Sequence, residues 1–401
     1  MARLLLLSNG HGEDLSGALL GQALKAQGHD VKALPLVGRG NPYSEESISL
    51  VGRTREFSTG GLGYTTLRGR LTELIQGQVI YLLRRLLRLI RIAGRYDLVV
   101  VIGDVIPVMA AWLCQRPVAT YLVAYSSHYE GKLRLPWPCG NCLKSQRFKA
   151  VFSRDALTAL DLSEQLKREV MFVGNPFMDA VLSPSNRLPY TKRRLGLLPG
   201  SRRPELEHNL LLLLGVIDLI PISQHNSPGG LEIDLALVGA LGDDHLNKLA
   251  KSHGWSLVLG QGSTPARLEK GGRQIQVRRK GFTSVLLSSD LLLCMAGTAA
   301  EQAVGMAKPV LQFPGQGPQF TAGFAEAQRR LLGPTVFCAA AACEGAELLK
   351  ATAKLAIELL ERSVNDPDLR RDCREQAMQR LGPQGGGSKM AAVISGLLQK
   401  S

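Results

Sequence analysis

The sequence predicts an α/β protein with two doubly wound, Rossmann-like domains, each built on a parallel sheet. Short, continuous apolar runs alternate with helical patterns along most of the 401 residues, which is typical of parallel strands buried on both faces. The Pro-rich polar stretch 183–194 interrupts this alternation and separates two series of runs. A chain of this length exceeds one ordinary core, so two domains facing a cleft are the economical architecture.

The first domain is predicted to span residues 1–183. It opens with the apolar run 3–8, then "NGHGED", an Ala/Leu-rich helix and a second apolar run at 31–37. Four further runs mark later strands of the same series: 97–104, 118–125, 150–154 and 170–176. Because helical patterns lie between most of them, we expect parallel strands joined by crossover helices.

The second domain is predicted to span residues 184–365. Its apolar runs are 195–200, 233–239, 255–260, 275–282, 290–297 and 309–315. Residues 366–401 have helical patterns broken by "NDPD" and "GPQGGGS". We expect helices there that can pack back on the first domain.

Composition and charge narrow the classes of function. Lys and Arg number 48 against 34 Asp and Glu, for a net charge of +14 and a pI near 9.6. This balance favours an anionic partner, such as a membrane surface, nucleic acid or a phosphorylated ligand. Aromatic residues make up only 5% and do not interleave with basic stretches, so no nucleic-acid partner is expected.

The apolar runs of the sequence predict neither a signal peptide nor a membrane-spanning helix. The apolar run near the amino terminus is too short for a signal peptide, and no stretch reaches the ~18 apolar residues of a spanning helix.

Seven scattered cysteines do not form a secreted disulfide framework. Cys139 and Cys142 make one CxxC, either an incidental pair or a redox or metal-binding one. We expect a cytoplasmic protein without a cofactor or a metal site.

The stretch 68–97 is unusually basic and apolar at once. Leucines and isoleucines between 82 and 90 flank Arg84, Arg85, Arg88 and Arg91, with almost no acid nearby. A sheet-covering helix with solvated arginines is one interpretation. The other is a helix within 75–95 that lies on the inner face of a membrane, its cations against anionic headgroups.

Ligands of open parallel sheets bind beyond the carboxyl ends of the strands, and three predicted strand ends carry unusual side chains. After the run 3–8, "NGHGEDLSG" places His11, Glu13 and Asp14 beside two glycines at a helix start. Acidic residues at a helix N-terminus are favoured by the helix dipole, which is the structural explanation. A general base or a hydroxyl-binding site is the functional one.

The second strand end is "LLPGSRRPELE". Ser201 can cap the following helix, and Pro204 is tolerated in its first turn. Capping does not explain Arg202 and Arg203. Free amides at a helix N-terminus together with an arginine fork can bind a diphosphate.

The third strand end is "AGTAAE". Thr298 and Glu301 have the T-x-x-E spacing of a capping box, which explains them structurally. Alternatively, Gly297 lets a ligand approach the backbone, and Glu301 accepts hydrogen bonds from two ribose hydroxyls.

Several motifs in register resemble the lipid-A-disaccharide synthase family of GT-B glycosyltransferases, and in particular its related branch in cyanobacteria and plastids. These motifs are "LLPGSRRPELE", "VGNPFMDAV" and "AGTAAEQAVGMAKPVL". The run "GTAAEQAVGMAKPVLQFP" with the following "GPQF" is also similar to the nucleotide-sugar half of the peptidoglycan N-acetylglucosaminyltransferase. The resemblance implies a GT-B fold and transfer of a hexosyl group from a UDP-sugar.

The resemblance also implies roles for individual residues. Gly200, Ser201 and Arg202 would face the donor diphosphate. Gly297 and Thr298 would add helix amides, Glu301 would hold the ribose, and Gln319 would touch the sugar. Asp104 matches a strand end proposed as catalytic, and His11 and Glu13 match a loop facing the acceptor.

Two departures from the family lie on the acceptor side. "GEDLSGALL" lacks the acid that follows Ser-Gly in the synthases, and "VIPVMAAW" replaces their Pro-Asp-containing loop. We therefore predict a metal-independent transferase with a UDP-sugar donor and a lipid or other membrane-associated acceptor of unnamed identity. The alternatives are a UDP-sugar 2-epimerase or hydrolase on the same fold, and a non-catalytic paralogue acting as a binding module.

Overall fold

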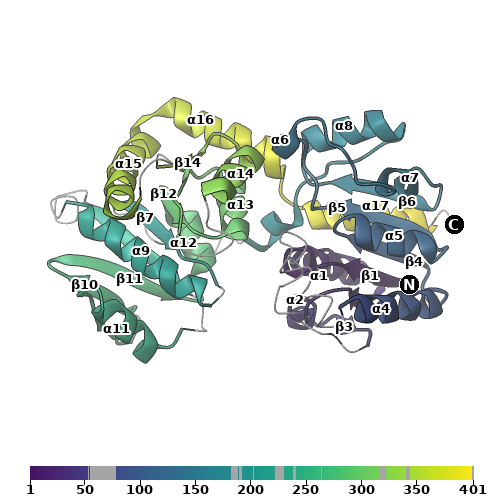
Figure 1. The fold of residues 1–401 in the computed structure, drawn as a ribbon, viewed down its shortest axis with the longest axis horizontal. Helices are drawn as coiled ribbons and strands as arrows, with labels where there is room; N and C mark the ends of the chain where they lie inside the picture. Colours follow the sequence, from purple (N-terminus) through teal and green to yellow (C-terminus); the bar gives the residue numbers. More distant parts are fainter. Residues whose placement is uncertain are drawn as a thin grey trace. The chain divides into compact units, whose positions relative to one another are not determined.

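The computed structural model describes residues 1–52, 54, 78–181, 188, 192–201, 203–221, 230–237, 241–262, 264–315, 322–339 and 344–399. The chain forms two compact units, each built on its own sheet (Figure 1). Unit 1 comprises Met1–Leu182 and Leu381–Ser401, and unit 2 comprises Ser183–Arg380. The sequence-based division is 1–183, 184–365 and 366–401.

Unit 1 is built on a six-stranded sheet of order β3-β2-β1-β4-β5-β6, in which every pairing is parallel. The strands are β1 (Arg3–Ser8), β2 (Asp30–Pro35), β3 (Ser49–Leu50), β4 (Leu98–Ile102), β5 (Val118–Leu122) and β6 (Phe148–Ser153). The chain winds outward from β1 to β3 and then returns to β4 on the other side of β1. The strand order therefore reverses between β1 and β4, where open α/β sheets bind ligands.

Helices cover both faces of this sheet. They are α1 (His11–Ala26), α2 (Asn41–Glu45), α4 (Gln78–Ala93), α5 (Val105–Leu113), α6 (Ser127–Glu130), α7 (Cys139–Leu143), α8 (Ala156–Leu166), the 3₁₀ segment η2 (Pro176–Val181) and α17 (Gly386–Gln399). Successive residues of β1 enter different cores: Leu4 and Leu6 pack with α1 and α17, while Leu5 and Leu7 pack with α4 and α5. Burial on both faces explains why the sequence of β1 is continuously apolar.

The expected strand at 170–176 does not form. Met171 makes an isolated bridge to Phe152, after which Gly174 turns the chain into η2. Gly174 lies so close to Gly386 and Pro383 that a Cβ on it would sit 2.2 Å from the Pro383 carbonyl oxygen. Close contact with the C-terminal segment, rather than strand pairing, therefore determines the conformation of this stretch.

The motif "VGNPFMDAV" holds the last helix on unit 1. The Asp179 carboxylate accepts hydrogen bonds from the backbone N–H groups of Gly385 and Gly387, each 2.8 Å long. These two bonds satisfy amides at the start of α17, as a helix N-terminus requires. The preceding helix, α16 (Pro367–Gln376), belongs to unit 2.

Unit 2 is built on an eight-stranded sheet of order β14-β13-β12-β7-β8-β11-β10-β9. The strands are β7 (Arg193–Leu198), β8 (Leu231–Leu237), β9 (Ser256–Val258), β10 (Arg267–Lys270), β11 (Arg273–Arg279), β12 (Leu291–Cys294), β13 (Val310–Gln312) and β14 (Val336–Cys338). The pairings from β14 through β11 are parallel, whereas β10 is antiparallel to both β9 and β11. Gly271 and Gly272, both with positive φ, make the tight turn between β10 and β11, a hairpin that the predicted strands do not include.

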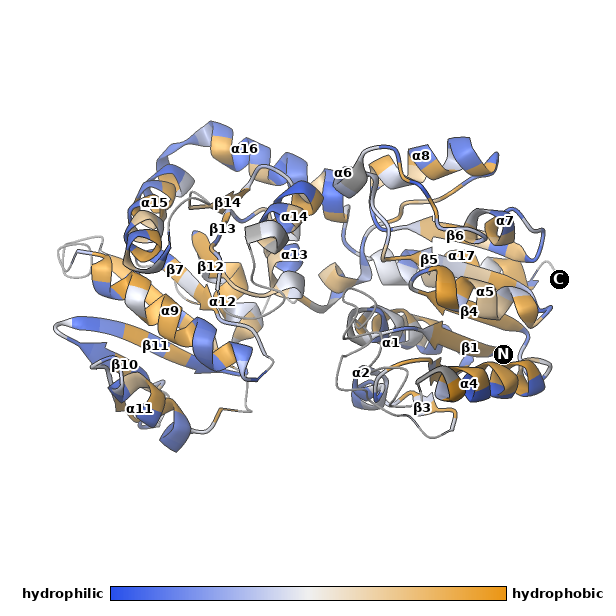
Figure 2. Ribbon diagram, viewed as in Figure 1, coloured by the Kyte–Doolittle hydropathy of each residue, from blue (hydrophilic) through white to orange (hydrophobic). Residues whose placement is uncertain are grey.

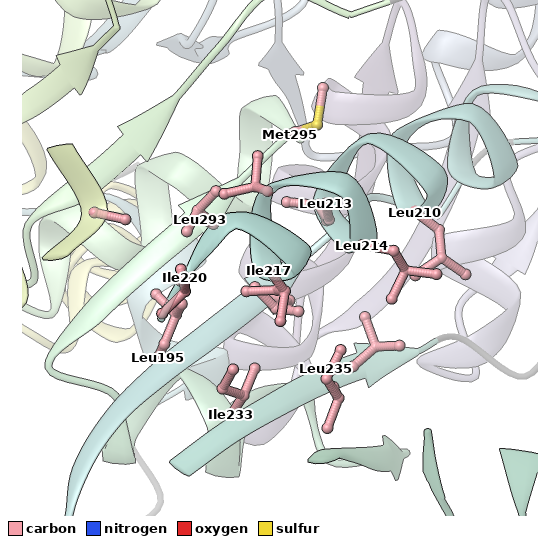
Figure 3. Packing of buried hydrophobic residues seen from close by; sticks show 14 of the residues in the cluster. Leu195, Leu210, Leu213, Leu214, Ile217, Ile220, Ile233, Leu235, Leu293 and Met295 are labelled. Carbon is pink, nitrogen blue, oxygen red and sulfur yellow. The ribbon is translucent and has the colours of Figure 1, made fainter. Parts of the chain in front are cut away.

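The described helices of unit 2 are α9 (Glu205–Leu219), α11 (Asp243–Lys251), α12 (Phe282–Ser288), α13 (Gly297–Gly305), α14 (Ala322–Leu332), α15 (Gly345–Asn365) and α16. The π-helical segment η4 (Ala377–Leu381) ends at the first residue of the C-terminal part of unit 1. The leucine-rich helix α9 lies on β7 and β8, with Leu210, Leu214 and Ile217 facing strand residues (Figure 3). In Figure 2, α9 is orange over much of its length, with blue and white segments between. The apolar packing of α9 fixes the direction in which the loop after β7 leaves the sheet.

Candidate functional site

The loops that follow β7 and β12 meet at the carboxyl edge of the unit 2 sheet. Gly200 has φ 100, and a Cβ on it would lie 3.4 Å from the carbonyl oxygen of Met295. The Met295 N–H donates to the Leu198 carbonyl at 2.9 Å, so the contact between the two loops continues past the strands. Glycine is favoured at position 200 because of its positive φ.

Asn209 ties the two loops to α9, a role that sequence reasoning missed. Its side chain is fully buried, and Nδ2 donates to the carbonyl oxygens of Pro199 at 2.9 Å and Met295 at 3.5 Å. The Oδ1 atom lies 3.2 Å from where a Cβ on Gly315 would be, in the segment after β13. A lone polar residue inside "HNLLLLL" is the sequence signal that indicates such a role.

The start of α9 differs from the prediction that Ser201 caps it. The helix begins at Glu205, with Pro204 at the N-cap position, so the exposed Ser201 lies too early to cap it. Arg203 is accounted for by an ion pair with Glu207, in which Nε lies 2.5 Å from Oε1. Arg202 lies outside the described residues, and so does Gln319.

The start of α13 also differs from the expected capping box. The helix begins at Gly297 with Ala296 as N-cap, and no side chain of the described chain caps it. Thr298 is therefore the second helical residue and cannot be the cap of a T-x-x-E box. The first main-chain N–H groups of α13 point out beyond β12 without a capping side chain, which is the arrangement that suits an anion.

Gly297, the first residue of α13, packs closely against a glutamine side chain. A Cβ on Gly297 would lie 2.8 Å from Nε2 of Gln328, and Gln328 in turn accepts a 2.6 Å hydrogen bond from Gln312. The half-buried Thr298 and Glu301 lie within the first turns of α13. The structure therefore places Gly200, Gly297, Thr298 and Glu301 at one edge of unit 2.

In unit 1, the carboxyl edge of the sheet carries carboxylate side chains. Asp104 follows β4 and caps α5, accepting a hydrogen bond from the Ile106 N–H at 2.9 Å. Asn9, which follows β1, donates from Nδ2 to both carboxylate oxygens of Asp104, each at 3.3 Å. Burial raises the pKa of Asp104, against the opposing effect of these hydrogen bonds.

Glu13 lies in the first turn of α1, close to this carboxylate. A Cβ on Gly10 would lie 2.6 Å from Glu13 Oε2, and one on Gly103 would lie 3.5 Å from Glu13 Cγ. Burial raises the pKa of Glu13, and the Asp104 charge adds to that rise. His11 is the first residue of α1, and its side chain lies outside the described part of the chain.

Asp14 also lies in the first turn of α1, where the helix dipole favours an acid. It is fully buried, accepts a 2.6 Å hydrogen bond from Ser8 Oγ, and Ser8 accepts one from the Tyr43 hydroxyl at 2.8 Å. Burial raises the pKa of Asp14 to about 7. Three acidic side chains whose protonation is shifted upward therefore cluster around the ends of β1 and β4.

The ends of β5 and β6 carry a further polar group that sequence reasoning missed. Asp155 caps α8 and also accepts from Ser126 Oγ at 2.7 Å, and His128 Nε2 lies 3.7 Å from Asp155 Oδ1. These residues are close in space but widely separated in the chain. Within the described ranges, no three His, Cys, Asp or Glu side chains cluster in a way that could hold a metal ion.

Cys139 and Cys142 lie in α7 as buried, free thiols. Burial raises the pKa of both, that of Cys139 to about 12. A thiol that stays protonated is a poor nucleophile, which favours the incidental-pair interpretation.

The predicted basic helix forms as α4, but not all four arginines are on its outer face. Arg84, Arg88 and Arg91 are exposed. Arg85 is 4% exposed, with Nε donating to the Pro35 carbonyl and Nη1 to the Val51 carbonyl, each at 3.1 Å. Arg85 therefore fixes α4 to the sheet edge, and its assignment to a membrane-facing role is wrong. No described helix combines the length and apolarity needed to cross a bilayer.

Comparisons with known proteins identify the fold. No family model and no curated protein sequence matches the chain. Among solved structures, the calicheamicin glycosyltransferase CalG4 is similar with a TM-score of 0.59 at 16% identity, covering 100% of this chain and 99% of that one. The glycosyltransferase SnogD from Streptomyces nogalater has a TM-score of 0.52 at 16% identity, covering 99% of each chain.

The UDP-GlcNAc 2-epimerase from Neisseria meningitidis, solved with UDP-GlcNAc bound, is similar with a TM-score of 0.52 at 12% identity, covering 100% of both chains. These glycosyltransferases and epimerases share the GT-B architecture of two Rossmann-like domains. The predicted GT-B fold is therefore confirmed, while identities this low indicate the fold alone.

Proposed function

We propose that this GT-B protein transfers a sugar from a UDP-sugar to a membrane-associated acceptor hydroxyl. One observation carries the donor half of the proposal: at the carboxyl edge of unit 2, two glycine-bearing loops approach each other beside the uncapped N-terminus of α13. Main-chain N–H groups at such a terminus bind phosphate oxygens. Structures on the same fold that hold UDP or UDP-GlcNAc support the choice of nucleotide.

The proposed donor contacts follow from this edge. The amides of Gly297 and Thr298, together with Gly200, Ser201 and Arg202, would hold the diphosphate. Glu301, one turn into α13, would accept hydrogen bonds from the ribose hydroxyls, and Gln319 would contact the sugar. A diphosphate leaving group held by amides and a guanidinium needs no divalent ion to carry its charge, so we propose a metal-independent reaction.

The proposed chemistry begins with removal of the proton of the acceptor hydroxyl. Asp104 would accept the proton of the acceptor hydroxyl while that oxygen bonds to the anomeric carbon of the sugar. The bond from the anomeric carbon to the β-phosphate oxygen breaks, and UDP leaves with the electron pair. The raised pKa of Asp104 makes it a stronger base than an exposed aspartate, and Asn9 holds its carboxylate in place. Glu13 and His11 would help to orient the acceptor.

The acceptor and its location are proposed from charge and surface chemistry. The net charge of +14 and the exposed Arg84, Arg88 and Arg91 of α4 support attachment to the anionic inner face of a membrane. The lipid-A-disaccharide synthase resemblance supports a lipid acceptor. We propose that the protein is a cytoplasmic, peripheral membrane enzyme.

Incubation with UDP-GlcNAc tests the reaction class directly. A transferase releases UDP only when vesicles containing a hydroxyl-bearing lipid acceptor are present. Epimer formation or UDP release without vesicles would instead assign the chain to the 2-epimerases or hydrolases, which the epimerase neighbours make the second candidate. Binding of UDP-GlcNAc without any product would indicate the non-catalytic binding module.

A further inference from the structure

Two buried glutamines lie beside the start of α13. Gln312 is the last residue of β13, Gln328 lies in the middle of α14, and each is 6% exposed. Helices α13 and α14 pack side by side (Figure 1), and α13 also contacts β13. Burial of a glutamine amide costs free energy unless its polar atoms find hydrogen-bond partners. Two such amides at one place therefore need an explanation.

The hydrogen bond between the two amides fixes the direction in which Gln328 points. Gln312 Nε2 donates to Gln328 Oε1 at 2.6 Å. Because the oxygen of the Gln328 amide faces Gln312, its NH₂ group is directed away from that residue. The Nε2 atom lies 2.8 Å from the position that a Cβ on Gly297 would occupy. Gln328 therefore brings a hydrogen-bond donor to the first residue of α13.

This donor lies on the amino-terminal side of Gly297. The Cα–Cβ bond of a helical residue tilts toward the helix N-terminus, so an atom beside the Cβ position of Gly297 is close to the first N–H groups of α13. Those N–H groups have no capping side chain within the described chain. Donors from α13 and from α14 therefore face the same space.

A capping role does not account for this arrangement. A cap would need the Gln328 oxygen, which is an acceptor, to face the N–H groups of α13, but that oxygen faces Gln312. Among the described residues, the Gln328 amide bonds to Gln312 alone, and Gln312 Oε1 is buried without a hydrogen-bond partner. Neighbouring donors without an acceptor are unfavourable, and one acceptor shared between them removes that cost.

We propose that Gln328 is a further ligand-binding residue of unit 2, whose Nε2 donates to an oxygen of the bound diphosphate. The same diphosphate accepts from the N–H groups of Gly297 and Thr298, and Gln312 is a positioning residue for the Gln328 amide. An oxyanion with several oxygens is the ligand class that accepts from all these donors at once. The inference rests on the proposed function for the identity of the ligand as UDP, but not for the binding of an oxyanion.

Replacement of Gln328 by methionine tests the donor. Q328M keeps an unbranched side chain of similar length and removes the N–H groups, so UDP binding measured by isothermal titration should weaken by roughly ten- to a hundred-fold. Uridine binding should stay within about twofold of wild type, because uridine has no phosphate to accept the bond. An unchanged Kd for UDP in the folded variant would overturn the proposal.

Replacement by glutamate should change stability and UDP affinity in opposite directions. In Q328E, the side chain can still accept from Gln312, and its second carboxylate oxygen can accept from the N–H groups of α13 as an anion would. The unliganded variant should melt at or above the wild-type temperature, while its UDP affinity falls at least as far as that of Q328M. A lower melting temperature with unchanged UDP affinity would show that Gln328 only packs between the helices, and would overturn the proposal.

A matched control makes the same change at an exposed glutamine of unit 2. Gln379→Glu adds one negative charge in η4, and its UDP affinity should stay within about twofold of wild type if position decides the effect. An equal loss of UDP affinity in Q379E and Q328E, with none in Q328M, would mean that the added charge acts at long range. That result would remove Gln328 from the site.

A double-mutant cycle tests the positioning role of Gln312. Q312M should weaken UDP binding by about three- to tenfold, because Gln328 keeps its N–H groups but loses the hydrogen bond that orients them. If Gln312 acts through Gln328, the double variant Q312M/Q328M should bind UDP as weakly as Q328M alone. Losses that multiply in the double variant would show that Gln312 acts independently, and would overturn its assignment.

Inorganic pyrophosphate separates this inference from the proposed function. Wild-type binding of UDP that all Gln328 variants share would leave the donor proposal intact and contradict the role of Gln328. Binding of pyrophosphate but not UDP, with loss of pyrophosphate binding in Q328M, would keep Gln328 in an oxyanion site and contradict the proposed nucleotide. Binding of neither ligand by the wild type would overturn both.

Discussion

Glycines and main-chain N–H groups follow β7 and β12 in unit 2, whereas carboxylates follow β1 and β4 in unit 1. In unit 2, Gly200 has a positive φ and Gly297 begins α13, which has no capping side chain among the described residues. In unit 1, burial raises the pKa of Glu13, Asp14 and Asp104. Two sheets of similar winding thus carry different groups at their carboxyl edges: main-chain N–H groups that suit an anion, and acidic side chains that suit proton transfer.

The largest expected effect is the loss of transfer rate when the proposed proton acceptor is removed. Asp104→Asn removes the base while keeping a side chain that can cap α5, so the transfer rate should fall by roughly 10²–10⁴-fold. UDP affinity should stay unchanged, because the substitution lies in unit 1. Turnover within a few-fold of wild type, measured by UDP release in the presence of acceptor vesicles, would assign the base to another residue.

The acidic edge of unit 1 should also give the protein an unusual dependence of stability on pH. The pKa of Asp14 is about 7 when folded, against 3.8 for an ordinary aspartate, so the folded state binds the proton more tightly than the unfolded chain. The free energy of unfolding should therefore decrease as pH rises from about 4 to about 7, by about 4 kcal/mol at most from this residue.

Asp14→Asn checks this explanation. The amide stays neutral and can still accept from Ser8, so the variant should be more stable than wild type at pH 8 and should depend less on pH. Denaturant unfolding at several pH values measures both quantities. Parallel curves for the two proteins would show that Asp14 is ionised in the folded state.

UDP binding at the carboxyl edge of unit 2 should depend on Arg202 but not on its neighbour Arg203. Arg202→Ala should weaken UDP binding by roughly ten- to a hundred-fold, because charge-assisted hydrogen bonds contribute about 1.5–3 kcal/mol. Arg203→Ala is the matched control, since its guanidinium pairs with Glu207. Isothermal titration that finds equal losses, or none in Arg202→Ala, would remove Arg202 from the site.

Asn209 offers a smaller, structural test of the same edge. Asn209→Ala leaves the carbonyls of Pro199 and Met295 without their donor and should cost about 1–3 kcal/mol of stability. UDP binding should weaken as well, because the two loops lose their link to α9. His208→Ala, at an exposed position on the same helix, should change neither quantity in thermal unfolding with and without UDP.

Local patterns predicted the fold well because parallel strands buried on both faces are continuously apolar. The runs at 3–8 and 290–297 correspond to β1 and β12, and the candidate residues that follow them come directly after these strands. The stretch 170–176 is equally apolar but bridges only once, because its conformation depends on Gly386, more than 200 residues later.

The site was harder to predict because its partners are distant in sequence. Asn9 holds Asp104 across 95 positions, and Asn209 reaches Met295 across 86. No local spacing reveals such pairs. Arg85 is different: it lies on the same helix face as the buried Leu89, four residues later, so helical periodicity alone could have separated it from Arg84 and Arg88.

The central claim is that the carboxyl edge of unit 2 binds UDP, and a thermal-shift titration of the wild-type protein tests it most directly. A ligand at about 100 times its Kd stabilises the folded state by about 2.7 kcal/mol, which raises the melting temperature measurably. We expect this rise with UDP and UDP-GlcNAc and a smaller one with uridine, which lacks the diphosphate. No rise with UDP or UDP-GlcNAc at millimolar concentration, or an equal rise with uridine, would contradict the account.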